Sequence, residues 1–155
     1  MEILSKSVRQ TLAIGKKLAQ NFCGGEIILL SGPLGAGKTV LAKGIAQGLG
    51  IDKNKITSPT FVLLRVHQGK HTLNHFDLYR IKTYADILAL GYEEYFYSDA
   101  VTLIEWPQRL KFLLPREFLK IKLLNKAKNQ RSLKFIAQGP RYKKLLVKIY
   151  ENISN

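Results

Sequence analysis

The eight residues Gly32–Thr39 constrain the fold of this chain more than any other segment. They read Gly-Pro-Leu-Gly-Ala-Gly-Lys-Thr and match the phosphate-binding pattern G-x-x-x-x-G-K-[ST] in full. Glycines in such a loop allow backbone angles that turn successive amide groups inward, which makes a nest for anions. The apolar run Glu26–Leu30 precedes the loop, and a helical pattern over Thr39–Leu49 follows it. A strand, a glycine loop and a helix in this order predict a P-loop nucleotide site.

The last two residues of the motif carry its charge and its metal chemistry. Lys38 is expected to reach the β- and γ-phosphates, and the Thr39 hydroxyl is expected to ligate Mg²⁺. The following helix adds the positive end of its dipole. A chance glycine-rich turn is the alternative interpretation, and the match of both motif and context disfavours it. The sequence therefore predicts a site for ATP and Mg²⁺.

Two carboxylates stand where such a site needs them. P-loop enzymes place an acid near Mg²⁺ and the attacking water, at the end of an apolar strand. Glu105 follows the sheet-like run Val101–Ile104, and Asp77 ends the predicted strand His71–Phe76. Each could instead be a surface acid at a strand end. His71 and His75 share one face of that strand, but no third ligand stands at metal spacing, so packing or hydrogen bonding is favoured over zinc.

Two further features near these segments have two interpretations each. Trp106 directly follows Glu105 and either stacks near the nucleotide or anchors the core, and the local pattern favours the anchor. The hydroxyl-rich loop Thr57–Thr60 lies after the P-loop helix, where many NTPases keep a segment that senses the γ-phosphate. Hydroxyl-rich loops are also common as ordinary turns.

The remaining periodicities predict one α/β domain over residues 1–155. Its mixed sheet is expected to be parallel around the P-loop strand, antiparallel at a hairpin edge and flanked by helices. Tyr92–Ser98 is expected to be irregular. The other predicted helices are Ser7–Phe22, Thr83–Leu90 and one that starts near Pro140. The other predicted strands are a hairpin of Phe61–His67 and His71–Asp77, the strand Ala100–Ile104, and the pair Leu119–Leu124 and Ser132–Ala137. A basic turn, Lys126–Arg131, joins the last pair.

The charge and composition of the chain limit its possible partners and its expected location. The net charge is +14, and the part from Arg109 onward holds 13 Lys or Arg against two acids. Such a field attracts RNA or an acidic protein, although an exposed lysine-rich surface is the simpler interpretation. The only cysteine, Cys23, lies in an apolar helical pattern and is expected to be a core or helix-end residue. Without a membrane-length apolar run or a secretory signal, a cytoplasmic protein that contacts no membrane is expected.

Four fragments together resemble one family. They are Gly32–Thr39, Ser58-Pro59-Thr60-Phe61, His75-Phe76-Asp77-Leu78-Tyr79-Arg80 and Ile104-Glu105-Trp106-Pro107-Gln108. In this order and spacing they resemble the TsaE (formerly YjeE) family, small bacterial ATPases of tRNA threonylcarbamoyladenosine (t6A) synthesis. The resemblance runs from about Thr11 to Leu124. Beyond it the chain departs from the family, because Asn129-Gln130-Arg131 stands where members tend to carry Gly-Arg.

The resemblance implies specific roles for residues of the motifs. Lys38, Asp77 and Glu105 form the implied catalytic set, in which Thr39 and Glu105 hold Mg²⁺ and Asp77 organises the metal and the catalytic water. The residues implied to lie around the ATP phosphates or the rest of the nucleotide are Leu34, Gly35, Ala36, Gly37, Lys38, Thr39, Thr60, Trp106 and Gln108.

The resemblance also implies partners. The family's weak ATPase acts with TsaD and TsaB, the complex that modifies adenosine 37 of tRNAs reading ANN codons. Contact with tRNA would come through that complex or through the basic region from about residue 109, and the chain alone is expected to be a monomer.

Two other functions remain open from the residues. A small-molecule P-loop kinase would share the loop and the small domain, but it usually carries an Arg-x-x-x-Arg lid. Arg80, Arg109 and Arg116 occur only singly. A basic RNA-binding module with a vestigial nucleotide site is disfavoured because Lys38 and Glu105 are intact.

Overall fold

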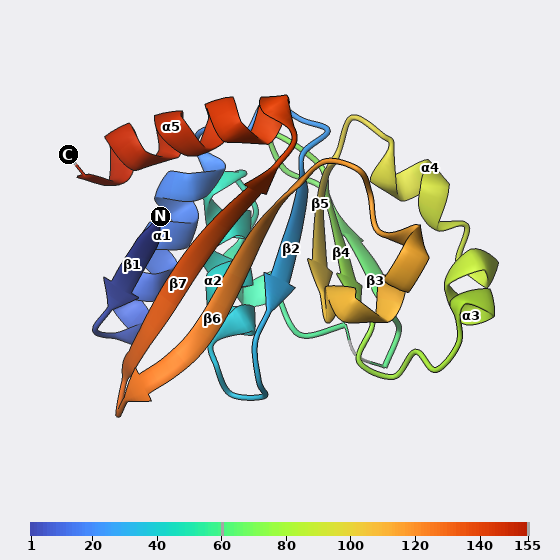
Figure 1. The fold of residues 1–155 in the computed structure, drawn as a ribbon, viewed down its shortest axis with the longest axis horizontal. Helices are drawn as coiled ribbons and strands as arrows, with labels where there is room; N and C mark the ends of the chain where they lie inside the picture. Colours follow the sequence, from blue (N-terminus) through green and yellow to red (C-terminus); the bar gives the residue numbers. More distant parts are fainter. Residues whose placement is uncertain (60, 155) are drawn as a thin grey trace.

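The P-loop strand β2 (Ile27–Ser31) lies at the centre of a seven-stranded mixed sheet in the computed structural model, which describes residues 1–59 and 61–154 (Figure 1). The strand order is β1-β7-β6-β2-β5-β4-β3. β6, β2, β5 and β4 run parallel, and β1, β7 and β3 pair antiparallel with their neighbours. The other strands are β1 (Glu2–Ser5), β3 (Leu64–His67), β4 (Leu73–Asp77), β5 (Val101–Glu105), β6 (Phe118–Ala127) and β7 (Gln130–Gln138). The predicted mixed α/β architecture is therefore confirmed.

Helices cover the two faces of the sheet unequally. α1 (Val8–Ala19), α2 (Lys38–Gly48) and α5 (Pro140–Ser154) pack on one face. The short helices α3 (Tyr84–Ala89) and α4 (Tyr92–Phe96), with the 3₁₀ segment η2 (Pro107–Leu113), cover the other face from β3 to β2 and reach only Phe118 at the start of β6. A second 3₁₀ turn, η1 (Lys53–Lys55), follows α2. No helix in the described ranges is long and apolar enough to cross a membrane.

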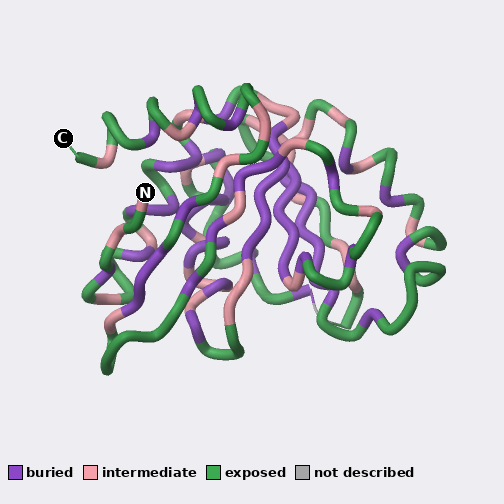
Figure 2. Tube along the Cα trace, in the orientation of Figure 1, coloured by how far each residue is buried: buried purple, intermediate pink, exposed green. Residues whose placement is uncertain are grey.

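The central strand is apolar because it is buried on both faces. Ile28 and Leu30 of β2 point into the core under α1 and α2, whereas Ile27 and Leu29 point into the core under η2 and α4. Figure 2 shows β2, β5 and β4 as nearly continuous buried segments. Such continuous apolar runs are typical of parallel strands covered on both sides. The strand that carries the P-loop is thus held on both faces.

A close approach of α1 and α2 fixes the helix that follows the P-loop. A Cβ on Gly15 would lie 2.7 Å from the Leu41 carbonyl oxygen, and a Cβ on Gly44 would collide with the Leu12 carbonyl. Both glycines are buried, so the two helix backbones touch where other helices meet through side chains. The position of α2 relative to the sheet therefore depends on these two residues.

Several predicted element boundaries were wrong. Tyr92–Ser98 is not irregular, because Tyr92–Phe96 forms α4. This helix buries Tyr92 and Phe96 in the core under η2 and α4. β1 was not predicted, since a four-residue edge strand has too little periodicity to be recognised. The hairpin of β6 and β7 is longer than expected and turns at Lys128-Asn129. β3 begins only at Leu64.

Two predictions about single residues were also wrong. Cys23 is exposed and not a core residue, because α1 already ends at Ala19 and the chain turns outward before β2. His71 lies before β4, which begins at Leu73, so it does not share a strand face with His75.

We expect Gly44→Ala to lower the free energy of unfolding by about 1–3 kcal/mol, because the added methyl group forces α1 and α2 apart. In an ordinary helix interior the same change stabilises by about 0.5–1 kcal/mol, so the two cases differ in sign. Urea denaturation followed by circular dichroism measures the difference. Gln47→Ala, at an exposed position of the same helix, is the control and should change stability little. A stabilised Gly44→Ala variant would contradict the close packing.

Candidate nucleotide-binding site

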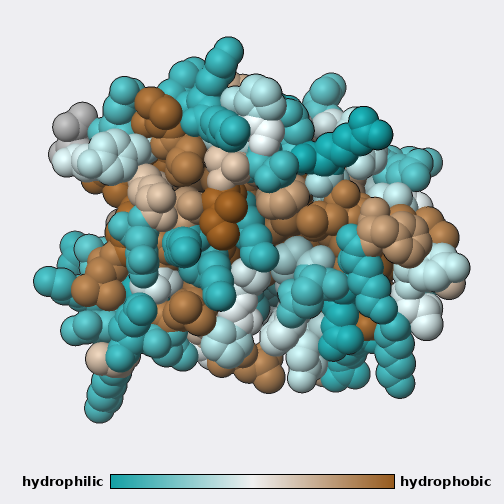
Figure 3. All heavy atoms as spheres, viewed as in Figure 1, coloured by the Kyte–Doolittle hydropathy of each residue, from teal (hydrophilic) through white to brown (hydrophobic). Residues whose placement is uncertain are grey.

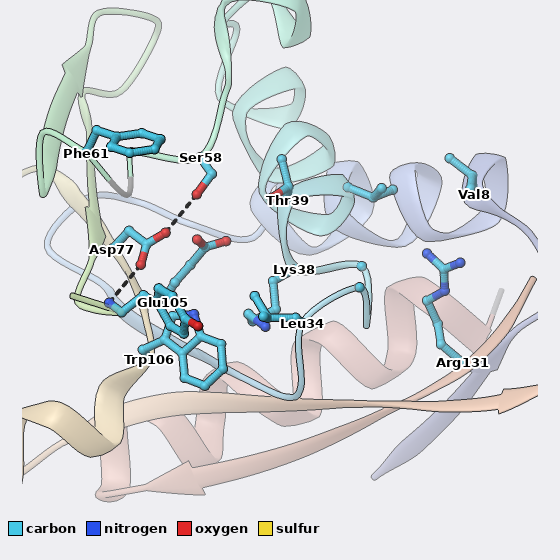
Figure 4. Close-up of a pocket in the computed structure, with 14 residues that line it drawn as sticks. Val8, Leu34, Lys38, Thr39, Ser58, Phe61, Asp77, Glu105, Trp106 and Arg131 are labelled. Atoms are coloured by element: carbon cyan, nitrogen blue, oxygen red, sulfur yellow. Dashed lines mark hydrogen bonds between the residues drawn. The ribbon is translucent and has the colours of Figure 1, made fainter.

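A cleft of about 540 Å³ opens where the P-loop meets the carboxyl ends of β4 and β5 (Figure 4). The loop itself, the first turn of α2, the segment after η1, the starts of α1 and β7, and the residue after β5 contribute to its walls. Ligands of open α/β sheets bind at this edge, outside the carboxyl ends of parallel strands. The cleft thus coincides with the position that the P-loop motif predicts.

Lys38 lies inside the loop with only 7% of its surface exposed. Its ammonium group donates hydrogen bonds to the carbonyl oxygens of Gly32 at 2.6 Å and Pro33 at 2.9 Å. The same nitrogen lies 4.6 Å from the centre of the Trp106 ring. Burial lowers the pKa of Lys38, while the nearby carboxylates of Glu105 and Asp77 oppose this shift. A cation is therefore held in place at the base of the cleft.

Glu105 and Asp77 end neighbouring parallel strands, and the strand register sets them side by side. Asp77 pairs with Glu105 between β4 and β5, and Glu105 pairs with Leu30 of the P-loop strand. Both carboxylates are about as buried as core residues, at 2% exposure each. This arrangement puts two acids beside the Lys38 ammonium, within one cleft (Figure 4).

The two carboxylates differ in their partners. Asp77 accepts a hydrogen bond from the Ser58 hydroxyl at 2.7 Å and from the Tyr79 amide at 2.9 Å. In contrast, the buried Oε1 of Glu105 accepts none from the described residues. His75 Nε2 lies 3.9 Å from that oxygen, and both nitrogens of its fully buried ring also lack hydrogen-bond partners within the described ranges. Glu105 therefore has a buried carboxylate oxygen that lacks a hydrogen-bond partner among the described residues.

The donor set fits Mg²⁺ better than a softer metal. Thr39, Asp77 and Glu105 all line the cleft and offer only oxygen ligands, including the unpartnered Oε1 of Glu105. Mg²⁺ prefers such oxygens and is usually held by one or two carboxylates together with substrate phosphates. Consistent with this, the described residues contain no group of three His, Cys, Asp or Glu that could hold an ion alone.

The remaining predicted residues divide between the cleft and other places. Trp106 lines the cleft, and its half-buried ring packs against the core under η2 and α4 and against Tyr79, 4.9 Å away between ring centres. Leu34, Gly35, Gly37 and Thr39 line the cleft, whereas Ala36 is buried beneath the loop. Gln108 is exposed and lies outside the cleft lining. Thr60 lies outside the described residues.

Sequence analysis missed Arg131, which reaches the cleft from the far hairpin. The residue was placed in a turn, but it is the second residue of β7 and shares the inward face of that strand with Leu133 and Phe135. Its guanidinium lies against the P-loop, 2.5 Å from where a Cβ on Gly37 would stand. Extending the alternation of Phe135 and Leu133 by two residues would have predicted this inward position.

Other residues of the lining also lacked a strong sequence signal. Val8 and Arg131 lie at the opposite end of the cleft from Trp106 (Figure 4), and Ser58 and Phe61 stand near Asp77. These side chains come from α1, β7 and the segment after η1, so only the fold brings them together. The Arg80 guanidinium stacks over the Phe61 ring, 4.2 Å from its centre.

Comparison with known proteins identifies the family. The model of the family described as "Threonylcarbamoyl adenosine biosynthesis protein TsaE" matches residues 5–133. The chain belongs to the TsaE family. It is 38% identical over 149 residues to the tRNA threonylcarbamoyladenosine biosynthesis protein TsaE of Bacillus subtilis, a match that covers 94% of this chain and 92% of that protein. The TsaE protein of Treponema pallidum is 40% identical over 123 residues, with 79% and 90% of the two chains covered.

A solved structure supports the same assignment. The crystal structure of YdiB from Bacillus subtilis superposes with a TM-score of 0.84 and 32% sequence identity, over 100% of this chain and 96% of that one. The match therefore includes the parts that the resemblance of the motifs did not cover, namely β1, the end of β6, β7 and α5.

We expect Gly37→Ala to lower the free energy of unfolding more than Gly35→Ala does. Both glycines have a positive φ, 101° and 76°, so each alanine incurs the left-handed penalty of about 1–2 kcal/mol. Only at Gly37 would the new methyl group also meet the Arg131 guanidinium, because nothing lies within 4 Å of the corresponding point at Gly35. Thermal unfolding of both variants measures the difference. Equal losses would show that the Arg131 contact does not constrain the loop.

Proposed function

We propose that this chain is an Mg²⁺-dependent ATP-binding protein and weak ATPase that serves the t6A modification of tRNA. The observation that carries the proposal is the cleft in which Lys38 of a complete P-loop faces the carboxylates of Asp77 and Glu105. Membership of the TsaE family supports the pathway, since the relatives are named for tRNA threonylcarbamoyladenosine biosynthesis.

In this proposal the loop binds the phosphates and Lys38 neutralises them. The backbone amides of 34–37 and the amino end of α2 donate to the phosphate oxygens. The Lys38 ammonium exchanges its hydrogen bonds with Gly32 and Pro33 for contacts with the β- and γ-phosphates. Since burial has already removed most of its water, the cation acts in a site of low dielectric, where its attraction for phosphate is strong.

The two acids have separate roles in the proposed reaction. Mg²⁺, when bound, would neutralise charge that develops on the β- and γ-phosphates. Thr39 and Glu105 would hold the ion, and the lack of a hydrogen-bond partner at Oε1 of Glu105 supports this role. Asp77, kept in one orientation by Ser58 and Tyr79, would orient the attacking water. Positioned groups of this kind account for most of the catalysis in phosphoryl transfer.

We assign the partners and the substrate by family membership. The chain would act with TsaD and TsaB on adenosine 37 of tRNAs that read ANN codons. Its ATP cycle would support turnover of that complex and would not form the new bond. Phosphate therefore leaves as free phosphate, whereas a small-molecule kinase would transfer it to an acceptor.

We expect Lys38→Ala to weaken ATP binding by at least about 100-fold. The variant loses charge-assisted hydrogen bonds to the phosphates, each of which contributes about 1.5–3 kcal/mol. Trp106 is the only tryptophan and lies beside Lys38, so its fluorescence can report titration of the wild type with Mg²⁺ and ATP. Lys38→Ala removes the ammonium group beside the Trp106 ring, so the tryptophan fluorescence of the variant is not directly comparable with that of the wild type. The affinity of the variant is therefore measured with a fluorescent ATP analogue. Lys43→Ala, a turn further along α2, is the control, and unchanged affinity in Lys38→Ala would contradict the P-loop assignment.

We expect Glu105→Gln to retain ATP binding but to lose hydrolysis by about 100-fold or more. The amide keeps the shape of the side chain but removes the charge that would hold Mg²⁺. Phosphate release under single-turnover conditions measures the chemical step, and titration over Mg²⁺ concentration separates metal binding from catalysis. Full hydrolysis in the variant would show that this carboxylate is not the metal ligand.

The pathway assignment needs a test with partners. Hydrolysis is measured for the chain alone and with TsaD, TsaB and a tRNA that reads ANN codons, and t6A on the tRNA is scored beside the phosphate released. We expect hydrolysis to rise with the partners and multi-round t6A formation to require this chain. If ATP is split while t6A formation is indifferent to the chain, the nucleotide site stands and a kinase acceptor becomes the next target.

A further inference from the structure

One part of the sheet has no helix over its outer face. β6 and β7 pack Leu119, Ile121, Leu133 and Phe135 against the helices on the inner face. On the opposite face α3, α4 and η2 reach only Phe118 at the start of β6, and the rest of β6, together with β7 and β1, has no helix in front of it (Figures 1 and 2). Figure 3 shows hydrophilic side chains interspersed with apolar ones over this open face.

The open face concentrates lysines, with one acid, Glu2 of β1, directly opposite Lys134 in the β1–β7 register. Lys122 and Lys134 are exposed and directly opposite each other in the β6–β7 register. Lys120 lies two residues before Lys122 on the same face, and Lys126 and Lys128 follow at the hairpin tip. None of these lysines lies within 4 Å of a carboxylate of the described residues. Like charges directly opposite each other destabilise a strand pair, so the β6–β7 pair by itself does not favour Lys122 opposite Lys134.

The same face begins at the edge of the nucleotide cleft. Lys122 pairs with Ser31 of β2, the residue directly before Gly32 of the P-loop. The Leu123 carbonyl lies so close to Gly32 that a Cβ there would collide with it. A ligand on the open face would therefore contact β6, the neighbour of the strand that carries the P-loop.

We propose that this lysine face binds the phosphate backbone of a double-helical stem of tRNA. The proposal extends the function proposed above and depends on it for the identity of the RNA. Lysine is a mobile point charge that suits phosphates, and contacts to phosphates position a protein without reading sequence. Along a strand, alternate residues stand about 7 Å apart, so Lys120 and Lys122 are neighbouring cations on β6, and Lys134 lies beside them on β7.

The composition of the face favours RNA over an acidic protein. Protein interfaces are enriched in aromatic residues and arginine and depleted in lysine. The exposed outward residues of β6 and β7 that the structure describes include Lys122, Leu124, Lys134 and Ile136, and none of them is aromatic or arginine. Because aromatic rings are also the platforms on which unpaired bases stack, their absence favours a stem over a single-stranded loop.

The test compares two double variants of equal charge. Lys122→Gln/Lys134→Gln removes the opposed pair, and Lys53→Gln/Lys55→Gln removes two exposed lysines of η1. Binding of an unmodified tRNA that reads ANN codons is measured by fluorescence anisotropy without ATP, between about 50 and 200 mM salt. We expect the first variant to bind at least about 10-fold more weakly and to reduce the slope of log affinity against log salt by about 1–2. The control should match the wild type.

Three outcomes would overturn the proposal: no binding of tRNA by the wild type at low salt, equal affinity and slope in both double variants, or a loss confined to binding of TsaD and TsaB. The last result would assign the face to an acidic protein surface. Titration of the same variants with Mg²⁺ and ATP through Trp106 fluorescence checks that they are folded. That titration also separates the two proposals, because a wild type that binds tRNA through Lys122 and Lys134 but not ATP would refute the proposed function alone.

Discussion

The cleft depends on the contacts of one buried charge, the Lys38 ammonium group. Lys38 is stable there because two loop carbonyls accept its hydrogen bonds and two carboxylates face it. Those partners are in place only because β2, β5 and β4 run parallel and in register. The close contact of α1 with α2 then fixes the helix that begins at Lys38. The central sheet and the pair of helices α1 and α2 thus together position the ammonium group of Lys38.

The antiparallel edge adds a second kind of support. β6 runs parallel to β2, but β7 returns beside it, and this reversal brings Arg131 back over the P-loop. The cleft is therefore assembled from both halves of the sheet, with Trp106 at one end and Arg131 at the other. A chain that ended after β6 would keep the P-loop motif yet lack one wall of its cleft.

Local patterns were sufficient for the centre of the molecule and insufficient for its periphery. The P-loop, its flanking strand and helix, and the acids Glu105 and Asp77 were predicted because each belongs to a short, self-contained pattern. α4 and β1 were missed because a five-residue helix and a four-residue edge strand are stabilised by tertiary packing and pairing, not by their own periodicity. Arg131 was missed for a related reason, since its role depends on a register between distant strands.

The contact between Gly32 and the Leu123 carbonyl has a thermodynamic consequence. The P-loop backbone at Gly32 packs directly against β6, with no room for a side chain between them. A shift of either backbone toward the other therefore meets a steric clash. If ligands on the two sides of this contact influence each other through it, the effect of one on the affinity of the other is reciprocal and equal in free energy. With such coupling, the loss of the γ-phosphate from a nucleotide in the cleft would change the affinity of the lysine face for its ligand, and binding on the lysine face would change the affinity of the cleft for the nucleotide.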